Sequence, residues 1–326
     1  MKRKIWFAVP LALLVICGGM MFWFNNEPDL FDPIELARQH AEEHDHADVT
    51  GTATTSALIE VVNVMLNKRG GYISNDILPP WVFLDNMPSW EFGALTQVRD
   101  LARVMRNDFS RSQTQSSEDP DLSEADPLLH YSHDRWFPPD TEGRYENAMG
   151  FLENYLARLS DPTQPNAQFY ARADNLAAWL GLVEKRLGSL SQRLSASVGQ
   201  ERLNTDLSGD TAATQSTISP QEVDVKTSWF QIDNVFYETR GSTWALIEFL
   251  RAMEVDFHDV LRKKNALISY RQIIRELEST QDSLHAPMVL NGDKFGAFAN
   301  HSLVMANYIS RANAAIMDLR TLLEQG

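Results

Sequence analysis

The chain has 326 residues, of which 44% are hydrophobic and 22% are charged. This composition excludes a disordered tail and is sufficient for the core of one large or two small domains. Acidic residues outnumber basic ones by 44 to 29, a formal net charge of −15, and so acidic a surface disfavours binding to nucleic acid. The single cysteine, Cys17, excludes an intramolecular disulfide and a metal site built from several thiolates.

The N-terminal segment has the pattern of a membrane anchor. Residues 1–4 contain three basic side chains, and residues 5–24 form an uncharged apolar run of the length needed to cross a hydrocarbon core about 30 Å thick. Aromatic residues lie at both ends of the run, as they do at membrane interfaces. We therefore expect a cytoplasmic stub, a transmembrane helix over 5–24 in the bacterial inner membrane, and a periplasmic C-terminal domain, because positive charges stay on the cytoplasmic side.

A cleaved signal peptide is the alternative interpretation of this segment. Cys17 and Gly19 would then occupy the −3 and −1 positions of the cleavage site. The apolar run continues beyond them to Phe24, however, and an A-x-A site is missing. A permanent anchor therefore fits the sequence better.

The residues after the anchor predict a linker and then a bundle of helices. Residues 25–48 are acidic and predict a juxtamembrane linker that ends in a polar helix. Residues 49–326 have helical rather than strand periodicity. Helices are expected over 53–68, 89–111 and 143–159, separated by a loop-like segment at 72–88 and an acidic, proline-containing connector at 113–142.

The clearest periodicity is a 4-3-4-3-4 spacing, which is typical of a coiled-coil seam. It comprises Leu176, Leu180, Val183, Leu187, Leu190 and Leu194. We expect a mobile polar loop over 199–227 and then an apolar helical stretch over 229–264, in which Gly241 is a candidate break. A second seven-residue repeat is expected in the last helix: Phe298, Met305, Ala312 and Leu319. The sequence thus predicts an all-α protein, with a single N-terminal transmembrane helix followed by an elongated periplasmic antiparallel helical bundle.

Four segments carry a resemblance to a known family. They are GGYISNDILPPW (70–81), VRDLARVMRNDFSRSQ (98–113), QFYARADNL (168–176) and EKRLGSLSQRLSASVG (184–199). Over nearly the whole chain the sequence resembles a group of proteobacterial inner-membrane proteins known only as a domain of unknown function. The resemblance implies a Gram-negative source and an envelope location, and it implies no activity, substrate or catalytic residue.

Two histidine clusters are candidate metal ligands. The first comprises His40, His44 and His46, in which the i, i+4 spacing would put two imidazoles on one helix face, as a zinc site can require. The alternative is a solvated juxtamembrane helix, because the segment lacks apolar residues to support a metal site. The second cluster comprises His130 and His133 beside several carboxylates, and its alternative is a surface loop.

Two further sets of residues are candidates for binding a partner. One face of a predicted helix carries Arg99, Arg103 and Arg106. These arginines could contact anionic lipid headgroups or an acidic partner, or they could pair with carboxylates of a neighbouring helix. The second set lies in an apolar, proline-rich segment: Trp81, Phe83 and Trp90. That segment is either an exposed docking loop or a plug that closes one end of the core, and its size favours the plug.

Enzymatic signatures are missing from the sequence. It has no G-x-S-x-G elbow, no H-E-x-x-H pair and no phosphate-cradling glycine loop. We therefore expect a non-catalytic scaffold or docking component of the cell envelope, without a cofactor. Its expected partners are the lipid bilayer, through residues 5–24, and an envelope protein or a second copy of the chain. The alternative is an envelope enzyme or metal-dependent sensor that uses one of the histidine clusters with nearby carboxylates.

Overall fold

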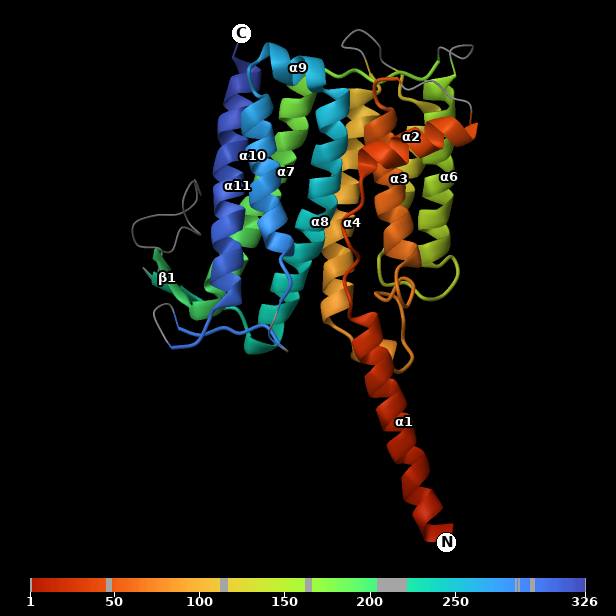
Figure 1. Ribbon diagram of the computed structural model, residues 1–326, viewed down its shortest axis with the longest axis vertical. Coiled ribbons are helices and arrows are strands. Elements are labelled where there is room, and N and C mark those ends of the chain that lie inside the picture. The colour runs from red at the N-terminus through yellow and green to blue at the C-terminus, as the bar shows by residue number, and fades with distance from the viewer. Residues whose placement is uncertain are drawn as a thin grey trace, which may run out of the picture.

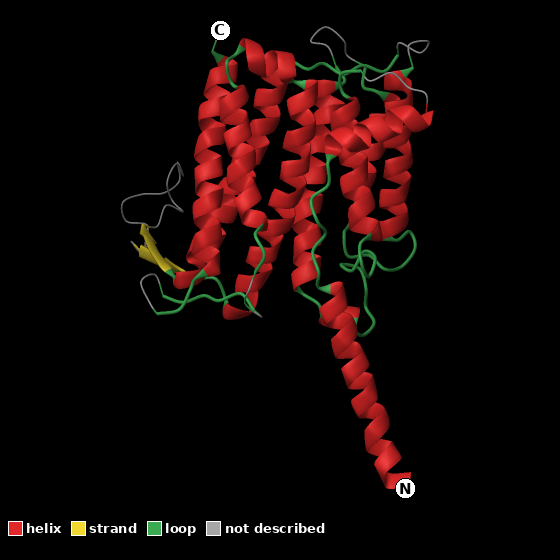
Figure 2. Ribbon diagram, in the orientation of Figure 1, coloured by secondary structure: helices red, strands yellow, loops and turns green. Residues whose placement is uncertain are grey.

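A computed structural model describes residues 2–44, 49–111, 117–161, 166–203, 222–284, 286, 288–293 and 297–325, with the backbone alone for 2–10, 40–44, 200–203 and 222–224. Within these residues the regular structure is helical apart from one short hairpin (Figure 2). Long antiparallel helices lie side by side, and helix α1 projects from one end of the bundle (Figure 1). The predicted all-α fold is confirmed.

The connections between consecutive α-helices differ in length, from the single residue Phe257 to long segments such as 68–85. The α-helices are α1 (Lys2–Phe24), α2 (Pro33–His44), α3 (Thr52–Asn67), α4 (Asn86–Val104), α5 (Pro120–Leu129), α6 (Thr141–Ser160), α7 (Ala173–Ser195), α8 (Ile232–Asp256), α9 (His258–Lys263), α10 (Leu267–Glu278) and α11 (His301–Glu324). Short 3-10 helices occupy Trp81–Phe83, Ala196–Val198, Trp229–Gln231 and Ser279–Gln281, and a π-helical segment, Met105–Phe109, extends α4. The hairpin pairs β1 (Gln200–Leu203) with β2 (Glu222–Val225) in antiparallel register.

Among the described residues, no helix combines the length and the apolar character that crossing a membrane requires. Helix α1 is a single helix of 23 residues. The side chains of residues 2–10, which include part of the membrane helix predicted over 5–24, lie outside the described ones. Most of the polar loop expected over 199–227 also lies outside the described residues, and the hairpin forms its base.

The predicted leucine seam lies on α7. All six of its apolar positions are buried, and α7 packs along α11. The second seven-residue repeat is correct from Met305 onward but wrong at Phe298, whose side chain is 76% exposed. The reason is local: the Asn300 side chain accepts a hydrogen bond from the Leu303 amide and starts α11 after Phe298.

Helices α4 and α8 form the centre of the bundle, between α3 and α6 on one side and α7, α10 and α11 on the other (Figure 1). Two glycines permit their close approach. A Cβ atom at Gly93 would lie 1.9 Å from the Glu238 carbonyl oxygen, and one at Gly241 would lie 1.9 Å from the Trp90 carbonyl oxygen. Helix α8 is continuous through Gly241, so the expected break is wrong. Gly241 instead allows the backbones of α4 and α8 to approach each other closely.

Gly241→Ala is expected to lower the free energy of unfolding by about 1–3 kcal/mol, because the added methyl group would push α4 and α8 apart. The matched control is Gly150→Ala in α6, where a Cβ atom would meet nothing within 4 Å. Removing a helical glycine without a clash is expected to stabilise the protein by about 0.5–1 kcal/mol. Urea unfolding of the full chain in detergent, followed by circular dichroism, measures both changes. Equal stability of Gly241→Ala and the natural protein would contradict the packing argument.

The segment between α1 and α2, residues 25–32, lies against α8, and we call it the strap. Its contacts recur along one face of α8, at Arg240, Trp244 and Glu248. Arg240 donates two hydrogen bonds to the Glu27 carboxylate, at 2.7 and 2.8 Å. The indole of Trp244 donates to the Asp29 carbonyl at 3.2 Å, and the Phe31 amide donates to Glu248 Oε1 at 2.9 Å. The strap therefore joins α1 to the core of the bundle.

Candidate functional site

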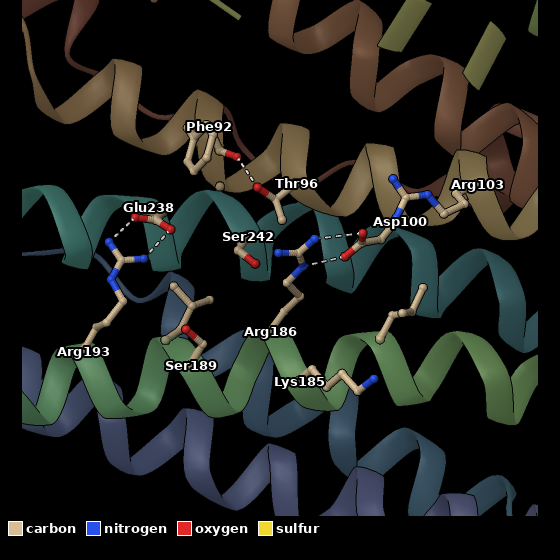
Figure 3. A pocket seen from close by; sticks show the side chains of 13 residues that line it. Phe92, Thr96, Asp100, Arg103, Lys185, Arg186, Ser189, Arg193, Glu238 and Ser242 are labelled. Carbon is tan, nitrogen blue, oxygen red and sulfur yellow. Dashed lines mark hydrogen bonds and ion pairs between the residues drawn. The ribbon is translucent and has the colours of Figure 1, made fainter. Parts of the chain in front are cut away.

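A cleft of about 400 Å³ opens between α4, α7 and α8, and we call it the central cleft (Figure 3). Its charged lining residues are Arg103, Lys185, Arg186, Arg193, Asp100 and Glu238. Four basic side chains thus face two acidic ones, an excess of two positive charges. This excess contrasts with the net charge of −15 of the whole chain.

Two arginines of α7 bind the two carboxylates through paired hydrogen bonds (Figure 3). Arg186 donates to Asp100 at 2.7 and 3.0 Å. Arg193 donates to Glu238 through two bonds of 2.6 Å. These hydrogen bonds raise the pKa of both guanidinium groups, so both arginines stay charged. Since a guanidinium has five N–H donors, each arginine retains donors for another acceptor.

The remaining polar lining is made of hydroxyl groups. Ser242, on α8, accepts a hydrogen bond from Gln97 at 2.8 Å, and Thr96 donates to the Phe92 carbonyl at 2.9 Å. Ser189 is exposed on α7. The described lining contains no histidine or cysteine, and both carboxylates are engaged by arginines. Since four cationic side chains line the cleft, this arrangement is suited to binding anions.

The three arginines predicted from the sequence have different surroundings. Arg103 lies in the central cleft, and its Nη2 is 2.7 Å from His130 Nε2. Arg99 donates to the carbonyl oxygens of Leu129 and Tyr131, at 2.8 and 2.6 Å. Arg106 pairs with Glu118 and Asp126, at 2.7 and 3.1 Å. Arg99 and Arg106 therefore connect α4 to the segment that carries α5, and Arg103 alone of the three lines the cleft.

The histidine candidates fall into two groups. His40 and His44 lie on α2 with side chains outside the described ones, and His46 is outside the described residues altogether. His130 contacts Asp126 at 3.0 Å, whereas the ring of His133 packs on Phe92, with centroids 5.0 Å apart. Burial lowers the pKa of His133. In the described part of the chain, no three histidine, cysteine or carboxylate side chains gather as a metal site requires.

The three aromatic candidates also differ in their burial and contacts. Trp90 is fully buried in α4 and its ring lies 5.0 Å from that of Trp244, so it has no surface for a partner. Trp81 stacks on Phe24, the last residue of α1, at 5.8 Å. Phe83 is 64% exposed. Trp90 thus fits the interpretation of a plug that fills the core, whereas Phe83 lies on an exposed loop.

Beside these aromatic residues, the loop 68–76 is held by one buried carboxylate. Glu91 is fully buried and accepts hydrogen bonds of 2.8 Å from the amides of Ile73 and Ser74. It also pairs with the ammonium group of Lys68, which is 3% exposed. The Arg69 guanidinium lies 4.8 Å over the Trp23 ring, so this loop contacts the end of α1.

Sequence reasoning missed most of the central cleft. Arg186 and Arg193 are seven residues apart and each precedes a leucine of the seam. This repeated heptad position was a usable signal, because it places both side chains on one edge of the buried face of α7. Their partners, Asp100 and Glu238, lie on helices distant in sequence, and the pattern of a single segment could not identify them.

The fold and the cleft define an all-α bundle with a projecting N-terminal helix and a cationic cleft. Residues 1–326 match the model of a family described as "Uncharacterized protein conserved in bacteria (DUF2333)". The chain belongs to this family, which confirms the resemblance inferred from the sequence. No curated protein and no solved structure gives a significant match.

Proposed function

We propose that this protein is a non-catalytic docking component of the bacterial cell envelope that binds an acidic segment of a partner protein in the central cleft. The observation that carries the proposal is the excess of positive charge in that cleft, on a chain that is otherwise acidic. Arginine matches carboxylates in planar, paired geometry.

The proposal includes an anchor in the inner membrane. Residues 5–24 would span the bilayer with the N-terminus in the cytoplasm and the bundle in the periplasm. Three observations support this placement: the uncharged apolar run, the projection of α1 away from the bundle (Figure 1), and the exposed apolar side chains along its described part, such as Leu14 and Phe22.

Charge reversal at the mouth of the cleft tests the docking function. A photo-crosslinking amino acid is placed at the exposed Ser189, and crosslinks are collected in the native cell. The variant Arg103→Glu/Lys185→Glu is expected to reduce the crosslink to an acidic partner by roughly tenfold, since two charge contacts are reversed.

The matched control is Arg262→Glu/Lys263→Glu, which makes the same charge change at exposed positions on α9. This control is expected to leave the crosslink unchanged. An equal loss in both variants would show that net charge, not the cleft, governs binding. A persistent crosslink in the cleft variant would contradict the proposed site.

A further inference from the structure

Exposed apolar side chains are concentrated at the end of the bundle from which α1 projects, which we call the α1 end. The loops that join α3 to α4, α5 to α6, α7 to α8 and α10 to α11 all lie there (Figure 1). Their exposed large apolar residues are Ile77, Leu78, Val82, Phe83, Trp136, Phe137, Val225, Trp229, Phe230, Met288 and Phe298. We call this set the apolar rim.

The opposite end of the bundle is different. In the described residues of its loops, 49–51, 110–111, 117–119, 161, 166–172 and 257–266, no large apolar side chain is exposed. Nearby helices contribute Ile34, Val255 and Ile268, and the last turns of α11 contribute Met317 and Leu322. Random exposure would not favour one end of the bundle, and a concentration of this extent marks an interaction surface.

The apolar rim is continuous with α1. Trp81, next to Val82 and Phe83, stacks on Phe24, and a Cβ atom at Gly70 would lie 2.8 Å from the Phe24 ring. The loop between α5 and α6 contacts the loop between α3 and α4, because the hydroxyl of Tyr72 donates a hydrogen bond to the carbonyl oxygen of His133 at 3.0 Å. The aromatic loops therefore lie at the level where α1 leaves the bundle.

From this continuity we infer that the apolar rim inserts into the interface of a phospholipid bilayer, so that the bundle stands on the membrane with its α1 end down. The inference rests on the proposed anchor. If α1 spans the bilayer, its last residues lie at the membrane surface, and the rim loops lie beside them. Tryptophan favours this interface, and phenylalanine and leucine side chains of peripheral proteins bury at the boundary between headgroups and acyl chains.

The attraction is apolar rather than ionic. Charged residues in the described parts of these loops include Asp76, Asp134, Asp140, Asp282 and Asp293, against Lys68, Arg69, Arg135 and Lys226. Carboxylates thus outnumber basic groups at this end, and they do not favour anionic lipid. Contact with a zwitterionic bilayer is therefore expected to persist at high salt, since salt screens charges but does not weaken apolar burial.

Site-directed fluorescence in vesicles tests the inference. The full chain, with Cys17→Ser to remove its single cysteine, is reconstituted in phosphatidylcholine vesicles. Single cysteines for a fluorophore are introduced as Phe137→Cys and Phe230→Cys in the rim, 61% and 82% exposed, and as Ile268→Cys near the other end, 83% exposed. A fourth label, Leu14→Cys, reports on α1.

Quenching by nitroxide lipids is expected to be several-fold stronger at 137 and 230 than at 268, with the opposite order for aqueous iodide, in both low and high salt. Strong lipid quenching at 14 combined with free access of iodide to 137 and 230 would overturn the rim inference and leave the anchor intact. Shielding of 137 and 230 from both quenchers would assign the rim to a contact between copies of the chain and overturn the inference. Iodide access at 14 would overturn the anchor and the inference together.

Discussion

Glu91→Ala is expected to lower the free energy of unfolding by about 3–5 kcal/mol. The change removes the fully buried carboxylate and leaves the ammonium group of Lys68, 3% exposed, without its ionic partner. It also removes the acceptor for the amides of Ile73 and Ser74. A buried charge that loses its partner costs far more than the pair contributes when intact. Urea unfolding of the full chain in detergent measures the loss.

Two companion variants separate the buried charge from the loop hydrogen bonds. Glu91→Leu/Lys68→Met removes both charges and is expected to be more stable than Glu91→Ala, because no unpaired ammonium remains. Ser74→Ala removes one hydroxyl and keeps the ion pair, so its expected cost is about 1 kcal/mol. If Glu91→Ala cost no more than Ser74→Ala, the proposed role of the ion pair would be wrong.

Glu248 is expected to make the stability of the protein depend on pH. Its side chain is fully buried, and burial raises its pKa to about 8, an effect that nearby Asp32 and Glu278 reinforce and Arg251 opposes. Its Oε1 accepts the Phe31 amide of the strap, whereas its Oε2 lacks a hydrogen-bond partner in the described part of the chain and lies 3.8 Å from Arg251.

The sign of the pH effect follows from proton binding. The ordinary pKa of a glutamate is 4.5 and that of Glu248 in the folded protein is about 8. Between these values the folded chain keeps a proton that the unfolded chain has lost. The free energy of unfolding therefore falls as the pH rises through this window, by up to about 1.4 kcal/mol per pH unit.

The variant Glu248→Gln isolates this contribution. The amide oxygen of glutamine still accepts the Phe31 amide but does not titrate. We therefore expect the variant and the natural protein to have similar free energies of unfolding near pH 4.5. At pH 8 we expect the variant to be more stable by roughly 2–4 kcal/mol. Unfolding curves across this range measure the difference. The control, Glu254→Gln, removes a less buried carboxylate of the same helix that pairs with Arg271, so the comparison separates the burial of Glu248 from the loss of one charge on α8. Parallel pH profiles of Glu248→Gln and the natural protein would refute the assignment.

The helices were predictable where their apolar residues repeat with a regular period. The six positions from Leu176 to Leu194 predicted a buried face, and all six are buried. The predicted break at Gly241 was wrong because helix propensity describes a residue within a single helix. A glycine weakens an isolated helix, yet here it admits the Trp90 carbonyl of a second helix. Only the pairing of α4 with α8 shows which effect prevails.

The candidate site was less predictable than the fold. Arg103 was identified from the sequence, whereas Arg186 and Arg193 were not. Their carboxylate partners are distant along the chain: Asp100 lies 86 residues from Arg186 and Glu238 lies 45 from Arg193. Periodicity within one segment contains no information about such pairs. The same limit applies to Trp90 and Phe83, which share a segment but differ completely in exposure.

The course of the strap has a mechanical consequence. The chain leaves α1 at one end of the bundle and runs along α8 toward the other end, where α2 lies (Figure 1). Tension applied to α1 along the long axis of the bundle is therefore directed along the strap. The contacts of Glu27, Asp29 and Phe31 with α8 then share the load in shear rather than rupturing one after another. A bundle joined to its N-terminal helix in this way can transmit tension from α1 to α8 without first unravelling at its N-terminus.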